Sequence, residues 1–130
     1  MTAQQEFFMA LKQALKNKGY RVFDGALPPE NTSYPFIYLA GSWNNPTDIK
    51  CGDLGRITQI VQVWGTYKMR GTISAMSEEV LKTARAIQTT DTFAYRVRLN
   101  ETEQQILEDN TTNTPLMQGY TSLRVQYSRR

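Results

Sequence analysis

The acidic residues that stand close together are the first candidates for chemistry, because paired carboxylates can act as general acid and base. Glu78 and Glu79 are adjacent in an expected helix, so their side chains point in different directions and are interpreted as surface charges. Glu101 and Glu103 could share one face of a strand, and Asp109 could lie near Glu101. Such an arrangement would give only a weak metal site. The sequence contains no histidine, the commonest general base and zinc ligand. We therefore expect no catalytic, cofactor-binding or metal-binding residue.

The nucleophiles lead to the same expectation. Without histidine, the Ser-His-Asp and Cys-His arrangements are excluded. The single cysteine, Cys51, cannot form an internal disulfide and is interpreted as a spectator thiol. Residues 52–56 contain two glycines but lead into an expected strand, whereas a phosphate-binding loop leads into a helix. We predict that the protein is not an enzyme.

The charge balance is mildly basic, with 15 Lys and Arg against 12 Asp and Glu and a formal net charge of +3. Dedicated nucleic-acid-binding domains are usually more basic, with clustered cations. Aromatic and arginine residues nevertheless alternate on neighbouring expected strands, which leaves a nucleic-acid-binding α+β module as the alternative hypothesis. Its candidate residues are Tyr95, Arg96, Arg98, Tyr120, Arg124 and Tyr127.

Length and hydrophobicity favour one domain over residues 1–130, long enough to bury about two-thirds of its unfolded surface. No apolar run approaches the roughly 20 residues that a membrane span needs. The first six residues lack the basic and apolar regions of a signal peptide, so we expect synthesis in the cytoplasm and no membrane partner.

Hydrophobic periodicity predicts two helices, at residues 3–18 and 73–87, each with one apolar face. Alternating or continuous apolar residues predict strands at 20–23, 36–41, 56–67, 94–99 and 120–127, and residues 103–108 continue the fourth strand past a bend. The order is α-β-β-β-α-β-β with a possible extra strand. It predicts a two-layer α+β domain, a mainly antiparallel mixed sheet with two helices packed on one face.

Two segments are predicted to be irregular. Residues 27–35 contain three prolines, which cannot donate to a strand ladder. Residues 42–55 form a long polar connection that we expect to be mobile in the free protein and to order on assembly.

The strand at 56–67 has apolar residues on both faces. Ile57, Val61, Val63 and Tyr67 are predicted on one face, and Ile60, Gln62 and Trp64 on the other. Two helices on one side leave the other side partly open, and exposed apolar patches mark protein–protein interfaces. The interface residues that we predict are Trp43, Ile60, Gln62 and Trp64.

These elements resemble, over nearly the whole chain, the tail completion proteins of tailed bacteriophages, also called tail terminators, of siphophages and prophages. The resemblance rests on the proline–aromatic start of a strand, on Val-Gln-Val-Trp followed by a polar turn and a helix, and on the glycine-led last strand. The matching segments are residues 34–39, 55–58, 61–64, the helix from about 74, and 119–125. The family often has a histidine where Gln118 stands, so no role is transferred to Gln118.

The resemblance implies structural work in the virion tail and neck. Such proteins form a ring, typically of six copies, on the head-proximal end of the tail tube. The ring ends tube growth and presents a surface to the head connector proteins, and DNA passes through it without specific binding. The implied partners are further copies of the chain, the tail tube protein and the connector proteins.

Overall fold

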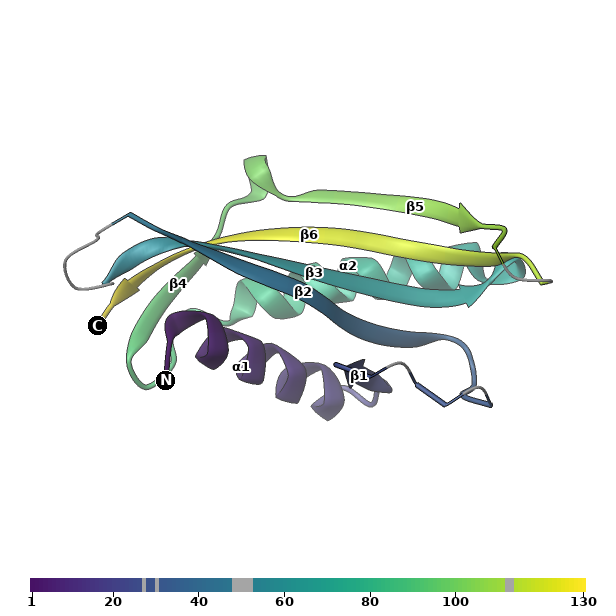
Figure 1. Cartoon of the computed structure of the whole chain (residues 1–130), viewed down its shortest axis with the longest axis horizontal. Coiled ribbons are helices and arrows are strands. Elements are labelled where there is room, and N and C mark those ends of the chain that lie inside the picture. Colours follow the sequence, from purple (N-terminus) through teal and green to yellow (C-terminus); the bar gives the residue numbers. More distant parts are fainter. Residues whose placement is uncertain (27, 30, 48–52, 112–113) are drawn as a thin grey trace.

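The computed structural model describes residues 1–26, 28–29, 31–47, 53–111 and 114–130. Within these residues, each of two α-helices is followed by three strands, and two short 3-10 helices, η1 and η2, lie between elements (Figure 1). The elements are α1 (Ala3–Asn17), β1 (Val22–Asp24), β2 (Phe36–Pro46), β3 (Leu54–Thr66), η1 (Tyr67–Met69), α2 (Arg70–Ala86), β4 (Phe93–Val97), η2 (Leu99–Glu101), β5 (Glu103–Asp109) and β6 (Leu116–Arg129).

The strands form one mixed sheet in the order β1-β2-β3-β6-β4. β1 and β2 are parallel, and the other pairs are antiparallel. β4 pairs with residues 125–129 of β6, and β5 pairs with residues 116–122 of the same strand. β4 and β5 therefore follow one another along one edge of β6, with η2 as the bend between them, which confirms the predicted continuation and the extra strand.

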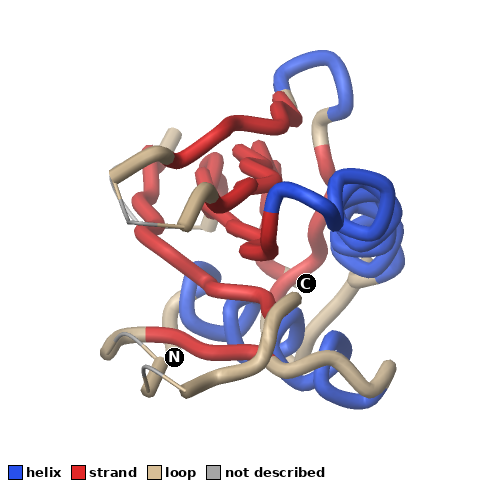
Figure 2. The backbone as a smooth tube through the Cα atoms, turned by 90° about the vertical axis from the view of Figure 1, so that its right-hand side faces the viewer, coloured by secondary structure: helices blue, strands red, loops and turns tan. Residues whose placement is uncertain are grey.

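Both helices pack on the same face of the sheet and run along the strands, so the predicted two-layer α+β architecture is confirmed (Figures 1 and 2). Register places Ile37 of β2, Val63 of β3 and Gly119 of β6 side by side on this face. Phe7 and Leu11 of α1 and Ile73 and Val80 of α2 are fully buried in the same core. The apolar positions at threes and fours thus became the buried faces of the helices.

Local signals fix the ends of α1. The Thr2 hydroxyl accepts a hydrogen bond of 3.1 Å from the Gln5 amide, as an N-cap residue does. Gly19 follows the helix with a φ of 94°, a conformation that glycine adopts without strain. α1 therefore ends where the sequence predicts, and the chain turns into β1.

The prediction of a loop at residues 42–55 is wrong at both ends of that range. β2 continues to Pro46, and β3 begins at Leu54. The register of β2 and β3 shifts between Leu39 and Ser42, which marks a β-bulge. Because the residues that follow the bulge are mostly polar, the sequence pattern did not indicate that the strand continues. The buried Gln59 side chain donates to the Ala40 carbonyl at 3.3 Å and so supports the irregular backbone there. Residues 48–52 of that predicted loop, Cys51 among them, lie outside the described residues.

Two further predictions need correction. Tyr67 was predicted to continue the strand on the same face as Val61 and Val63, but it begins η1 and is 55% exposed. Arg98 was predicted within a strand, but β4 ends at Val97 and Arg98 precedes η2. In both cases the chain leaves the sheet one or two residues before the alternating pattern ends.

Candidate functional site

The face of the sheet opposite α1 and α2, here called the open face, is the candidate site. Neither α-helix packs on it, and only Glu101 of the short helix η2 is shown to reach it among the described residues, through its ion pair with Arg56. Cross-strand register assigns side chains to it, because directly opposed residues in an antiparallel pair point to the same side. Its central residues are Phe36, Tyr38 and Trp43 of β2, Thr58, Ile60, Gln62 and Trp64 of β3, and Gln118, Tyr120, Ser122 and Arg124 of β6.

Gln62 and Trp64 form the middle of an aromatic region on this face. The Trp64 indole N–H donates to the Gln62 side-chain oxygen at 3.1 Å. Tyr38 on β2 and Tyr120 on β6 stand directly opposite Gln62 on either side. All four side chains are half-buried, so each retains surface that a partner could cover.

One end of the aromatic region is closed by other rings. Phe36 lies opposite Trp64 and contacts Phe23 and Tyr34, with ring centroids 5.5 Å away in both cases. The Tyr38 hydroxyl donates to the Gly25 carbonyl at 2.7 Å. The segment before β2, which sequence analysis singled out for its prolines, thus adjoins the open face at Tyr34.

The four predicted interface residues lie on this one face but differ in exposure. Ile60 is only 7% exposed, whereas Trp43 is 47% exposed. Gln62 and Trp64 are in contact through their hydrogen bond. Trp43 pairs with Thr58, six residues along β3 from Trp64, which is about 20 Å at strand spacing. The structure therefore brings Gln62 and Trp64 together and places Trp43 at the other end of the face.

Arginine residues gather at the Trp43 end. Arg124 lies opposite Thr58, and Arg96 and Arg56 lie on either side of Gln126. The Arg56 Nη1 atom is 2.6 Å from one oxygen of Glu101, an exposed ion pair. The two carboxylate oxygens of Glu101 therefore pair with Arg56 and Arg98, whereas the sequence made Glu101 a candidate metal ligand.

The aromatic residues of the nucleic-acid alternative divide between the two faces. Tyr95 and Tyr127 are 6% and 2% exposed and lie in the core. The Tyr95 hydroxyl donates to the Ala3 carbonyl at 2.8 Å, and burial raises the pKa of Tyr95. Tyr120 alone of the three tyrosines lies on the open face. A stacking platform needs exposed rings on the central strands, and two of the proposed rings serve the core instead.

The other carboxylates have ordinary structural partners. The Asp109 side chain accepts hydrogen bonds from the Thr111 hydroxyl and amide, and the hydroxyl contact is the larger cause of the lowered pKa of Asp109. Glu78 lies 3.7 Å from Lys82 on the surface of α2. Within the described residues, no group of three or more Cys, Asp or Glu side chains is arranged to hold a metal ion. No described helix combines the length and apolar character of a membrane span.

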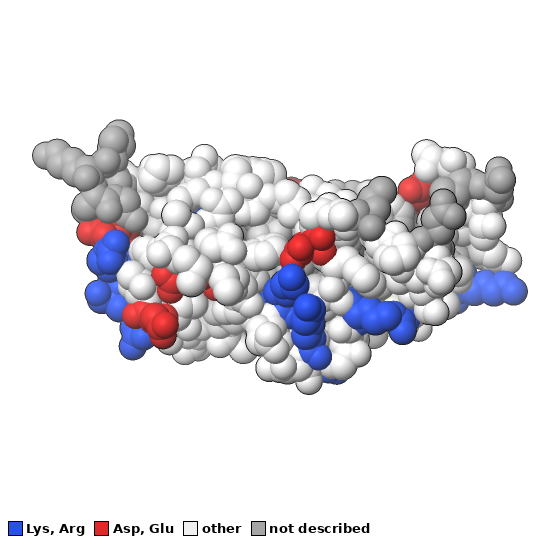
Figure 3. All heavy atoms as spheres, turned by 60° about the horizontal axis from the view of Figure 1, so that its bottom comes forward, with Lys and Arg blue, Asp and Glu red and all other residues white. Residues whose placement is uncertain are grey.

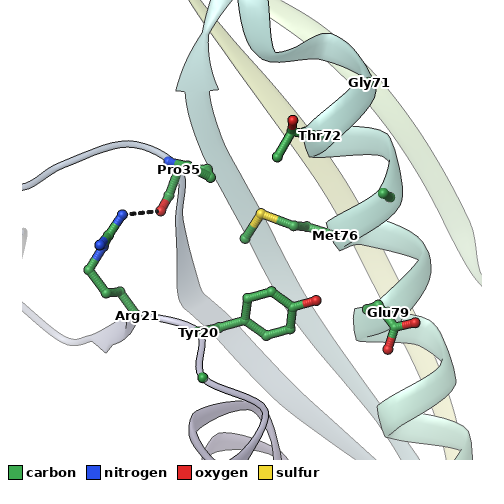
Figure 4. Close-up of a pocket in the computed structure, with 9 residues that line it drawn as sticks. Tyr20, Arg21, Pro35, Gly71, Thr72, Met76 and Glu79 are labelled. Atoms are coloured by element: carbon green, nitrogen blue, oxygen red, sulfur yellow. Dashed lines mark hydrogen bonds between the residues drawn. The ribbon is translucent and has the colours of Figure 1, made fainter.

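A pocket of about 630 Å³ lies between the α1–β1 connection and α2 (Figure 4). Tyr20 and Met76 point into it from opposite sides. Both charged residues that line it have partners. Arg21 donates to the Pro35 carbonyl at 3.0 Å, and Glu79 accepts from Lys18 at 3.2 Å. These contacts join the end of α1 to α2 and to the segment before β2.

No protein-family model matches this chain, and a search of curated proteins found no similar sequence.

Proposed function

We propose that this chain is a structural protein of a tailed-phage virion that caps the head-proximal end of the tail tube. In this proposal it assembles as a ring of six copies that joins the tail to the head connector proteins, and DNA passes through the ring. The proposal combines the resemblance described above with the character of the open face. It assigns the protein to the virion tail and neck and gives it no enzymatic activity.

The observation that carries the proposal is the half-buried aromatic region around Gln62 and Trp64. Tyrosine and tryptophan are enriched in protein interfaces, where large rings with one polar atom pack against a partner. Here such residues lie on a sheet face that no described helix covers. A second protein surface would bury them as the helices bury the other face.

Ring closure requires two different surfaces on each subunit, because a ring is built from head-to-tail contacts. The aromatic region supplies one surface. The segment at residues 28–35 is the candidate for the other, as its end adjoins the open face through the stacked rings of Tyr34 and Phe36. In such a ring, the aromatic region of one copy would contact the segment before β2 of the next copy.

Gln62→Glu tests the proposal, because a carboxylate can still accept the Trp64 indole N–H but brings a charge to the interface. We expect nearly unchanged thermal melting and at least a roughly tenfold rise in the concentration needed for ring assembly. Gln13→Glu makes the same chemical change on the exposed side of α1 and serves as the matched control.

Native mass spectrometry would measure the rings, and electron microscopy would measure tail length in a phage carrying each variant. The control should form normal rings and tails. Normal assembly by Gln62→Glu would remove the aromatic region from the interface. A wild-type chain that stays monomeric both alone and with tail tubes would overturn the proposed function.

A further inference from the structure

A groove of about 890 Å³ opens between the C-terminal end of α2 and the β4–η2 segment. Three of the nine residues that line it are arginines, and none is acidic. The lining consists of Arg85, Gln88, Thr89, Tyr95, Arg96, Val97, Arg98, Leu99 and Asn100. A concave surface with charges of one sign focuses the electrostatic field and attracts ions of the opposite sign.

The three arginines differ in how they are held. The Arg98 Nε atom lies 3.1 Å from Glu101, and its Nη1 atom donates to Gln126 at 3.0 Å, so its guanidinium is oriented by the fold. Arg85 and Arg96 are exposed, and within the described residues no hydrogen bond or ion pair occupies either guanidinium. The groove is therefore lined by one arginine that is paired with Glu101 and by two arginines whose guanidinium groups have no partner among the described residues.

Three neutral residues of the groove add hydrogen-bond donors from which an anion could accept. The side chains of Gln88 and Asn100 carry amide N–H donors, and Thr89 carries a hydroxyl. Phosphate oxygens accept from such donors, and the planar guanidinium of arginine fits two of them at once. The Tyr95 hydroxyl is committed to the Ala3 carbonyl, so it is not part of this donor set.

Further arginines extend from the groove across the adjoining part of the open face. Arg96 is separated from Arg56 by one strand, β6, and Arg124 lies two residues along β6 from the Gln126 that stands between them. Two carboxylates lie near these five arginines. Glu101 contacts both Arg56 and Arg98, and Glu103 lies opposite Ser122, two residues along β6 from Arg124. On the α1 side of the molecule, by contrast, the charged side chains lie in small separate groups on a largely uncharged surface, some of them mixed and some basic only (Figure 3).

We propose that this arginine groove, defined by Arg85, Arg96 and Arg98, binds the phosphate groups of a nucleic-acid backbone without reading its sequence. A row of cations that leads away from the groove suits a chain of phosphates better than a single one. The groove also lacks the exposed stacking rings of a single-strand platform, so contacts to the backbone carry the binding. The inference does not depend on ring assembly.

The test compares the double variant Arg85→Gln/Arg96→Gln with the control Lys16→Gln/Arg70→Gln, which removes the same charge from exposed sites elsewhere. Binding of fluorescent single- and double-stranded DNA oligonucleotides of several sequences would be measured by anisotropy across salt concentrations. Thermal melting of each variant would show that the fold is intact. Inorganic phosphate and ATP are the probes for a free phosphate ligand.

We expect the groove variant to bind at least roughly tenfold more weakly, with the slope of log K against log salt reduced by about 1.4–1.8, as loss of two phosphate contacts predicts. The control should change affinity by less than about twofold. Equal affinities of the two variants would overturn the proposal. It would also be overturned if ATP or phosphate bound more tightly than the oligonucleotides, since the groove would then serve a free phosphate compound.

Discussion

Gly119→Ala should force α2 away from the sheet, because β6 approaches the helix closely at this glycine. A Cβ atom there would lie 2.8 Å from Cγ2 of Ile73 and 3.5 Å from Cβ of Val63, and it would also collide with the Ser77 hydroxyl. Ile73 and Val63 are buried, so neither can move into solvent. Gly65 on β3 makes a similar approach, with an added Cβ 2.9 Å from Ile73. α2 thus rests on two glycines.

The size of the effect follows from these contacts. Overpacking a well-packed core costs about 1–3 kcal/mol, and simultaneous collisions with two buried residues of α2 place this variant in the upper half of that range. For a chain of this length, about 2 kcal/mol corresponds to a fall in Tm of roughly 6–10 °C. The Ser77 hydroxyl is the only buried side-chain polar atom without a hydrogen-bond partner among the described residues. Ser77→Ala therefore removes one collision without removing a hydrogen bond.

Urea denaturation followed by circular dichroism would measure the free energy of unfolding of the two single variants and the double variant. We expect Ser77→Ala alone to be close to neutral and the double variant to recover about 1 kcal/mol relative to Gly119→Ala. Gly41→Ala is the matched control, because nothing lies within 4 Å of a Cβ atom there and the backbone is compatible with alanine. A Gly119→Ala protein as stable as the Gly41→Ala protein would refute the reasoning.

Two smaller predictions concern α1. Thr2→Ala should cost about 1 kcal/mol in urea denaturation, because the Gln5 amide loses its capping acceptor, and Thr2→Ser should restore most of it. A hydrogen bond from the Thr90 side chain and contacts with Thr92 lower the pKa of Glu6, so its contribution to stability is present above about pH 4.3 and is lost as the pH falls through the lowered value. The free energy of unfolding, measured by urea denaturation, should therefore fall less between pH 5 and pH 3 for Glu6→Gln than for the wild type. Equal falls for the two proteins over this pH range would contradict the assignment.

Much of the fold could be predicted because local patterns and tertiary packing agree. Ile57, Val61 and Val63 occupy alternate positions of β3, and the apolar residues of α2 recur every three or four residues. Both spacings match the buried faces that the structure shows. The extension of β2 through Trp43 and Asn44 could not be predicted in the same way. Its polar residues continue the strand only because a bulge restores the pairing with β3 and Gln59 supports it.

The open face was predictable in outline and the arginine groove was not. Ile60, Gln62 and Trp64 alternate along a single strand, so their common face follows from the sequence, whereas the burial of Ile60 depends on the packing of the whole sheet. Arg85 and Arg96 belong to different elements, and only the packing of α2 beside β4 places them in one groove. The spacing of Arg85 and Arg96 in the sequence does not predict that they lie close together.

The two faces of the sheet should therefore respond differently to substitution. On the helix side, Gly65 and Gly119 set the distance between α2 and the strands, so a change there alters the free energy of unfolding. Gln62 on the open face and the arginine groove between α2 and β4 both contact solvent, so a change at either should alter binding at nearly constant Tm. Variants that lower Tm from the helix side should weaken ring assembly and DNA binding together, through loss of folded protein. Variants of the open face should weaken one of the two activities alone, because Gln62 and Arg96 lie in different regions of that face.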